Sequence, residues 1–172
     1  MTRRLTAAVG ERYAPDRGTL KRQLDELSVA ASTAAERPRL FYEIDITGGI
    51  FTPPADSIYG DMFSLAGSEP IAGNANYSIS LEDLVAADPE VILLGDAAYG
   101  VTADAVKKRS GWGGMTAVKA GRIVAVDDIV ITRPGPRLVQ GLYDLIRAIH
   151  PDLSLDLPDV SFPPEPAASS AP

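Results

Sequence analysis

The sequence predicts an α/β fold, a Rossmann-like three-layer sandwich with a mostly parallel sheet. Short apolar segments alternate along the chain with segments in which apolar residues recur every three or four positions, and this alternation is typical of βαβ units. The length of 172 residues fits one domain, and a chain of this size buries enough surface to fold without a metal or a disulfide. We therefore expect one sheet covered by helices on both faces.

The first predicted element is a helix over residues 19–37, preceded by an N-terminal extension over residues 1–18. Residues 19–36 contain neither Gly nor Pro, and Pro38 ends the segment. Spacings of three and four place one apolar stripe on this helix, made of Leu20, Leu24, Leu27, Ala31 and Ala34. The stripe predicts that one face of the helix is buried.

Strands are expected over residues 40–45, 90–95 and 122–126, where apolar residues dominate. The second of these contains the unbroken apolar run 91–94, which indicates a strand buried on both faces. The three strands are expected to belong to the parallel sheet.

Helices are expected to begin at Asp56 or Ser57, at Ser80 and at Thr102. These side chains can accept hydrogen bonds from the free amide groups of a first helical turn. Gly67 is expected to end the first of these helices.

The closing helix is expected to start at Pro136, because proline suits the first helical position. Its predicted buried face consists of Leu138, Leu142, Leu145 and Ile149. Six prolines fall within residues 151–172, so this tail is predicted to be a linker or a disordered extension outside the core.

Composition excludes several functional classes. The chain has no cysteine and one histidine, His150, so thiol catalysis and Cys-based metal sites are excluded, and a His-dependent site must use this residue. The net charge is −7, with about +3 on residues 1–39 and about −10 on the rest, which argues against nucleic acid as a partner. The sequence contains no apolar run of membrane-spanning length and no recognisable export signal.

Three loops are predicted to meet at the carboxyl edge of the sheet, where ligands of such folds bind: residues 46–55, 95–101 and 127–135. In the last loop, Pro134 and Pro136 stiffen the backbone around Arg133 beside a helix start, where an anionic group would be favoured. The alternative for the neighbouring Arg137 is a structural ion pair with Asp127, Asp128 or Asp144.

Single aromatic and acidic residues have competing interpretations. Phe51, Tyr77 and Tyr99 fall in predicted loops, where exposed aromatic side chains often contact ligands, although each could fold back onto the sheet. Trp112 is expected to be a core anchor, and by position alone Glu82 is a solvated residue in a first helical turn.

No catalytic or nucleotide-binding motif is present. The sequence contains no Gly-x-Ser-x-Gly elbow, Walker loop or His-Glu-x-x-His pair, and the glycines around Trp112 do not directly follow a predicted strand. We therefore predict that the protein is not an enzyme and that it has neither a cofactor nor a metal site of its own.

Five blocks of sequence, in this order, resemble a known family: RLFYEID at 39–45, LAG at 65–67, SLEDLVAADPEVILL at 80–94, GW with AVKAGR within 111–122, and RPGPRL at 133–138. They are similar to the C-terminal lobe of the substrate-binding proteins of ABC importers for iron–siderophore, haem and cobalamin. The resemblance covers residues 20–150 approximately.

The resemblance implies two Rossmann-like lobes joined by one long helix, with the ligand held between them. Residues 19–37 then correspond to the end of the interlobe helix, and residues 38–150 to the C-terminal ligand-binding lobe. Because a complete member of the family is nearly twice as long, we expect the chain to be either a fragment of a longer exported protein or a natural half-receptor.

The resemblance also implies roles for individual residues. Glu82 matches a glutamate that forms salt bridges with arginines of the transporter's membrane subunits, and Arg133 matches a loop arginine that contacts ligand. Phe51, Thr52 and Tyr77 correspond to positions that line the ligand cleft. With the loop residues added, the expected ligand-binding set is Phe51, Thr52, Tyr77, Tyr99, Asp128 and Arg133.

The function expected from the resemblance is that of a non-catalytic receptor lobe that binds a metal chelate such as a ferric siderophore, haem or a corrinoid and docks on ABC permease subunits. Such a protein is extracytoplasmic, and it meets the membrane only through the transporter or a lipid anchor. Two alternatives stay open: a chelatase-like enzyme that inserts a metal into a tetrapyrrole, and a protein interaction module without a small ligand. His150 is expected on the wrong side of the fold for the chelatase.

Overall fold

A four-stranded parallel sheet lies at the centre of the protein. The computed structural model describes residues 17–132 and 137–155. Its strands run in the order β3 (Glu69–Pro70), β1 (Arg39–Glu43), β5 (Val91–Leu94), β6 (Ile123–Ala125), and every neighbouring pair is parallel. The parallel sheet predicted from the sequence is confirmed, and its three expected strands form the adjacent positions β1, β5 and β6.

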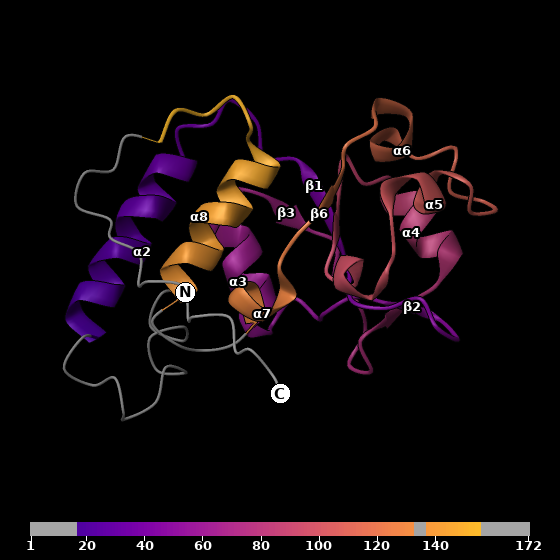
Figure 1. The fold of residues 1–172 in the computed structure, drawn as a ribbon, viewed down its shortest axis with the longest axis horizontal. Helices are drawn as coiled ribbons and strands as arrows, with labels where there is room; N and C mark the ends of the chain where they lie inside the picture. The colour runs from indigo at the N-terminus through magenta and orange to yellow at the C-terminus, as the bar shows by residue number, and fades with distance from the viewer. Residues whose placement is uncertain (1–16, 133–136, 156–172) are drawn as a thin grey trace, which may run out of the picture.

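Helices cover both faces of this sheet, as the predicted sandwich requires (Figure 1). One layer consists of α2 (Arg17–Ala31), α3 (Ile58–Leu65), α7 (Asp128–Thr132) and α8 (Leu138–Ile149). The other consists of α4 (Leu81–Ala87), α5 (Ala103–Lys107) and α6 (Thr116–Ala120). A short helical turn, η2 (Ala97–Tyr99), and an antiparallel pair of two-residue strands, β2 (Ile50–Phe51) and β4 (Ser78–Ile79), complete the described elements.

Alternation along the strands separates two apolar cores. Leu40 and Tyr42 of β1 point into the core shared with α2, α3 and α8, whereas Phe41 points into the core beneath α4, α5 and α6. All four residues of β5 are at most 1% exposed. The prediction that this strand is buried on both faces is therefore confirmed.

The N-terminal helix is shorter than the sequence suggested. It ends at Ala31 rather than near residue 37, and the hydroxyls of Ser32 and Thr33 donate to the carbonyls of Val29 and Ala30 in its last turn. The backbone amides of Ser32 and Thr33 donate to the same two carbonyls at 3.1 Å, so the chain leaves the helix through a tight last turn well before Pro38. Leu20, Leu24, Leu27 and Ala31 are buried as predicted, while Ala34 lies beyond the helix.

The predicted helix starts are observed at three capping residues. The side chains of Ser57, Ser80 and Thr102 each accept a hydrogen bond from a backbone amide of the following turn. Gly67 adopts the left-handed conformation, with φ of 81°, two residues after the last residue of α3. The local chemistry of these residues therefore places the ends of the helices around the sheet.

Two further expectations concern the core. Trp112 is 2% exposed and meets Phe41 edge to face, with ring centroids 5.9 Å apart, so its predicted anchoring role is confirmed. The tail from residue 151 was expected to lie outside the core. Leu153 and Leu155 instead pack against the core that includes α2 and α8, so the first residues of the tail belong to the fold. Residues 156–172, residues 1–16 and the predicted helix start at Pro136 lie outside the described residues. Across the described ranges, each helix is too short or too polar to span a bilayer.

The buried stripe of α2 gives a direct test of its packing. We predict that Leu27→Ala, at a fully buried position, lowers the free energy of unfolding by about 2–5 kcal/mol, because it removes apolar contacts and leaves a cavity. Val29→Ala on the same helix, at a side chain that is 66% exposed, is the matched control and should change stability by less than about 0.5 kcal/mol. Urea denaturation measures both, and equal effects would show that α2 is not packed against the sheet domain.

Candidate functional site

A cavity of about 550 Å³ opens at the carboxyl edge of the parallel sheet. Its lining comes from the segments that follow β1, β5 and β6, and consists of Ile44, Asp45, Ile46, Thr47, Gly95, Asp96, Tyr99, Val101 and Asp128. Parallel strands bring these segments together, because their carboxyl ends all meet at one edge. The three loops expected from the sequence to form a ligand site thus contribute to one cavity.

Tyr99 and Asp128 are the two expected ligand residues that line this cavity. Tyr99 lies at the end of η2 and is 90% exposed, so its ring is available to a ligand. Asp128, at the start of α7, accepts a hydrogen bond of 2.5 Å from the buried hydroxyl of Tyr42. Burial, followed by this contact with Asp128, raises the pKa of Tyr42 far above its ordinary value, so the phenol stays neutral and remains a donor.

Gly95 makes the contact between Tyr42 and Asp128 possible. A Cβ atom at position 95 would lie 2.2 Å from the Tyr42 hydroxyl and 3.0 Å from the carbonyl oxygen of Glu43. Only glycine leaves room there for the Tyr42 phenol against the end of β5. The small residue at this strand end is therefore required by the side chain beneath the cavity.

Phe51, Thr52 and Tyr77 lie together beside the cavity without lining it. The carbonyl of Phe51 accepts from the amide of Ile44, and the amide of Thr52 donates to the carbonyl of Tyr77, both at 2.9 Å. Thr52 is completely buried, Phe51 is half-buried, and Tyr77 is 40% exposed with a left-handed backbone at φ 61°. In this structure, Tyr77 is the member of this group with the most surface open to a ligand.

The remaining residues that the sequence singled out are the expected ligand arginine Arg133, its neighbour Arg137 and the expected docking residue Glu82. Arg133 lies outside the described residues, and Arg137, beside the start of α8, is half-buried. Glu82 is exposed in the first turn of α4, where the helix dipole favours a carboxylate. Because α4 leads through Asp88 into the amino end of β5, this first turn points toward the carboxyl edge of the sheet.

Beneath the cavity lies a buried ion pair that the sequence analysis missed. Glu43, the last residue of β1, is 0% exposed and binds both terminal nitrogens of Arg109, with Nη2 2.8 Å from Oε1. The guanidinium carbon of Arg109 lies 4.6 Å from the ring centroid of Trp112, a cation–π contact. The sequence signal that could have indicated this ion pair was Glu43 itself, the single acidic residue within the otherwise apolar segment 40–44.

Asp96 was also missed, although it falls in a predicted loop. It is 4% exposed, and in the described structure neither of its carboxylate oxygens has a hydrogen-bond donor within reach. Burial, followed by the neighbouring Glu43 carboxylate, raises the pKa of Asp96 to about 7. A proton held between these two carboxyls would convert their contact into a hydrogen bond, so the pair can carry one proton near neutral pH.

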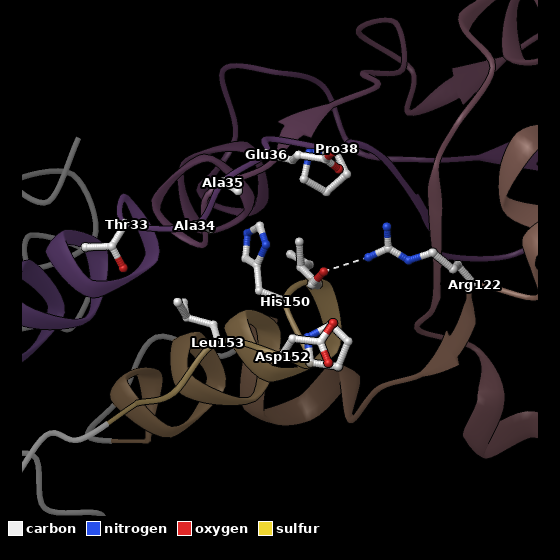
Figure 2. A pocket seen from close by; sticks show the side chains of 11 residues that line it. Thr33, Ala34, Ala35, Glu36, Pro38, Arg122, His150, Asp152 and Leu153 are labelled. Atoms are coloured by element: carbon white, nitrogen blue, oxygen red, sulfur yellow. Dashed lines mark hydrogen bonds between the residues drawn. The ribbon is translucent and has the colours of Figure 1, made fainter.

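His150 occupies a second cavity, of about 670 Å³, at the opposite edge of the sheet (Figure 2). Pro38, just before β1, and Arg122, just before β6, mark this as the amino edge, and Arg122 donates to the carbonyl of Ile149 at 2.7 Å. Burial lowers the pKa of His150, so the imidazole is neutral at neutral pH. Within the described residues no three His, Cys, Asp or Glu side chains are grouped so as to hold a metal ion.

The titration of Asp96 predicts a pH dependence of stability. Because folding raises its pKa from 3.8 to about 7, the folded chain binds more protons than the unfolded chain between those values. The stabilisation that Asp96 provides is therefore present below about pH 4 and is lost as the pH rises through about 7. We predict that the free energy of unfolding of the native chain, relative to that of Asp96→Asn, falls across this window.

Urea denaturation at several pH values between about 4 and 8 measures this difference. The groups that face Asp96 are Glu43 and Tyr42 from β1 and Arg109 from the segment after α5, and all of them are unchanged in the variant. A difference that stays constant with pH, or that rises with it, would show that Asp96 ionises as an ordinary carboxyl.

Comparison with known proteins places this architecture in a family. The family model described as "Periplasmic binding protein" matches residues 19–130. A substrate-binding lipoprotein of an ABC transporter in Bacillus subtilis, YvrC, which is described as uncharacterized, is 31% identical over 138 residues, covering 78% of this chain and 43% of that protein. A cobalamin-binding protein of Halobacterium salinarum is 30% identical over 126 residues, covering 69% of this chain and 33% of that protein.

A solved structure shows the same fold. The periplasmic vitamin B12 binding protein BtuF of Vibrio cholerae superposes with a TM-score of 0.65 at 19% identity, over 86% of this chain and 59% of that chain. The chain covers less than half the length of both curated relatives. Since the family model matches more than half of its residues, the chain belongs to the periplasmic binding protein family.

Proposed function

We propose that the chain is a ligand-binding lobe of the substrate-binding component of an ABC importer, and that it holds one side of a metal chelate such as a corrinoid, haem or a ferric siderophore at the carboxyl edge of its sheet. The observation that carries this proposal is the cavity of about 550 Å³ formed by the loops after β1, β5 and β6. Family membership supports a receptor role, and the names of the relatives support an ABC transporter and, in one case, a corrinoid as ligand. The role is binding and not catalysis.

The proposed location is outside the cytoplasmic membrane, with the permease as protein partner. A lipoprotein among the relatives supports this location. The exposed carboxylate of Glu82 in the first turn of α4 is the proposed docking contact, since a charged side chain on the surface can pair with an arginine of a partner without first being desolvated. It lies toward the edge that also carries the cavity, so ligand and permease would meet neighbouring parts of the lobe.

The chelatase alternative is not favoured. Insertion of a metal into a tetrapyrrole would call for metal-ligating side chains next to the bound ring, and His150 lies at the opposite edge of the sheet from the cavity. The proteins to which the chain is similar are described as binding proteins.

Ligand binding tests the proposal directly. We expect titration of the chain with ferric siderophores, haemin and cobalamin to show weak binding of at least one of them, because a single lobe contacts one side of the chelate. Tyr99→Ala should weaken that binding by about tenfold, since it removes an exposed aromatic surface from the cavity. Val85→Ala, at an exposed apolar side chain on α4, is the control and should leave the affinity unchanged.

Binding of none of the three chelates at millimolar concentration would contradict the receptor role. Binding that Tyr99→Ala leaves intact would place the ligand elsewhere on the molecule.

Docking is tested in cells that depend on this importer. Glu82→Arg is predicted to lower chelate uptake at least severalfold, because it puts like charge against the permease arginines, while the affinity for chelate stays the same. The matched control is Asp104→Arg, a charge reversal at an exposed first-turn residue of α5, and it should preserve uptake. If uptake with Glu82→Arg equals that with the control, Glu82 has no docking role.

A further inference from the structure

The cavity at the carboxyl edge is lined by three carboxyl groups. Asp45 follows β1, Asp96 follows β5 and Asp128 begins α7. The other side chains that line it in the described structure are uncharged. A ligand that enters this space therefore meets hydrogen-bond acceptors far more often than donors.

Each of the three carboxyls keeps capacity to accept a hydrogen bond from a ligand. One oxygen of Asp45 accepts from the amide of Thr47, and one oxygen of Asp128 accepts from the hydroxyl of Tyr42. Asp96 has the greater need of a hydrogen-bond donor, because it is 4% exposed and neither of its carboxylate oxygens accepts a hydrogen bond in the described structure. A buried acceptor without a donor costs free energy, which a ligand N–H group would recover.

The cation of the buried ion pair does not change this balance. Arg109 lies beneath the cavity and does not line it, and its two terminal nitrogens are held by Glu43. Its guanidinium also stacks on Trp112, at 4.6 Å from the ring centroid. Among the described side chains that line the cavity there is therefore no guanidinium with which an anionic group of a ligand could pair.

We propose that this cavity, within the receptor function proposed above, selects chelates whose outer groups donate hydrogen bonds, such as carboxamides and amines, over chelates that carry carboxylates. The reason is chemical complementarity: an amide N–H supplies the donor that Asp96 lacks, whereas a carboxylate meets three carboxyls and, among the described side chains that line the cavity, no cation to offset the repulsion. When Asp96 and Glu43 share a proton, the second oxygen of Asp96 can still accept a hydrogen bond from the ligand.

Matched probe pairs test the selection. Cobinamide and cobyrinic acid share a corrin ring but carry carboxamides and carboxylates respectively, and haemin can be compared with its propionic diamide in the same way. We expect titration of the full chain to show that the amide form binds at least tenfold more tightly than the acid form in each pair that binds.

Substitutions of the cavity carboxyls test whether the cavity causes the preference for the amide form. Asp96→Asn replaces one acceptor oxygen by a donor and should reduce the preference to about threefold or less. Asp45→Asn should shift the preference in the same direction, and because Asp45 is exposed and its turn to Thr47 needs only one side-chain oxygen, this variant is expected to fold normally. Asp104→Asn, an exposed carboxyl on α5 outside the cavity, should leave the preference unchanged.

Three outcomes would count against the ligand selection, and they distinguish its failure from failure of the receptor function. Equal or tighter binding of the acid forms would overturn the selection while leaving the receptor function in place. A preference for the amide form that persists in both Asp96→Asn and Asp45→Asn would also overturn it. Binding of neither form of either pair would overturn the selection, and it would contradict the receptor function as well if ferric siderophores do not bind either.

Discussion

The ion pair between Glu43 and Arg109 holds together the part of the fold on which the cavity is built. Glu43 ends the central strand β1 with no exposed surface, so its charge is tolerable only because Arg109 binds both of its oxygens. Removing one partner of such a pair costs about 3–5 kcal/mol, because the other charge is left buried. Arg109 also stacks on Trp112, which meets Phe41, so the same interaction joins the sheet to the segment between α5 and α6.

The buried carboxylate also sets the electrostatics of the cavity above it. Asp96 lies on the adjacent strand end, and its pKa is raised by burial and by Glu43. The hydroxyl of Tyr42 packs against Gly95, where no side chain displaces it, and donates to Asp128. Structural and ligand-facing carboxyls are therefore neighbours at one edge of the sheet, and the packing that stabilises the fold also fixes the acceptors offered to a ligand.

Local features of the fold were predictable from the sequence because they depend on neighbouring residues. Ser57, Ser80 and Thr102 cap their helices through bonds to amides three positions ahead, and the unbroken apolar run of β5 indicated its burial. The loops of the cavity were predictable for a different reason, since a parallel topology brings all carboxyl ends to one edge. That topology placed Tyr99 and Asp128 on a common cavity.

The buried network was not predictable, because it joins residues far apart in the chain. Glu43 and Arg109 are 66 positions apart, and nothing near Arg109 in the sequence marks it as the partner of a strand residue. Asp96 was one of several acidic loop residues, and only its position beside Glu43 distinguishes it. The packing of Leu153 depends in the same way on tertiary contacts, which override the proline-rich composition of the tail.

We propose that ligand binds at the carboxyl edge of the sheet and not in the larger cavity around His150. Backbone amide NMR shifts of the chain, recorded before and after cobinamide is added, distinguish the two sites. We expect shifts to change at residues 44–47, 95–101 and 128, with residues 33–38 and 149–153 unaffected. Shifts confined to the second set of residues would contradict it.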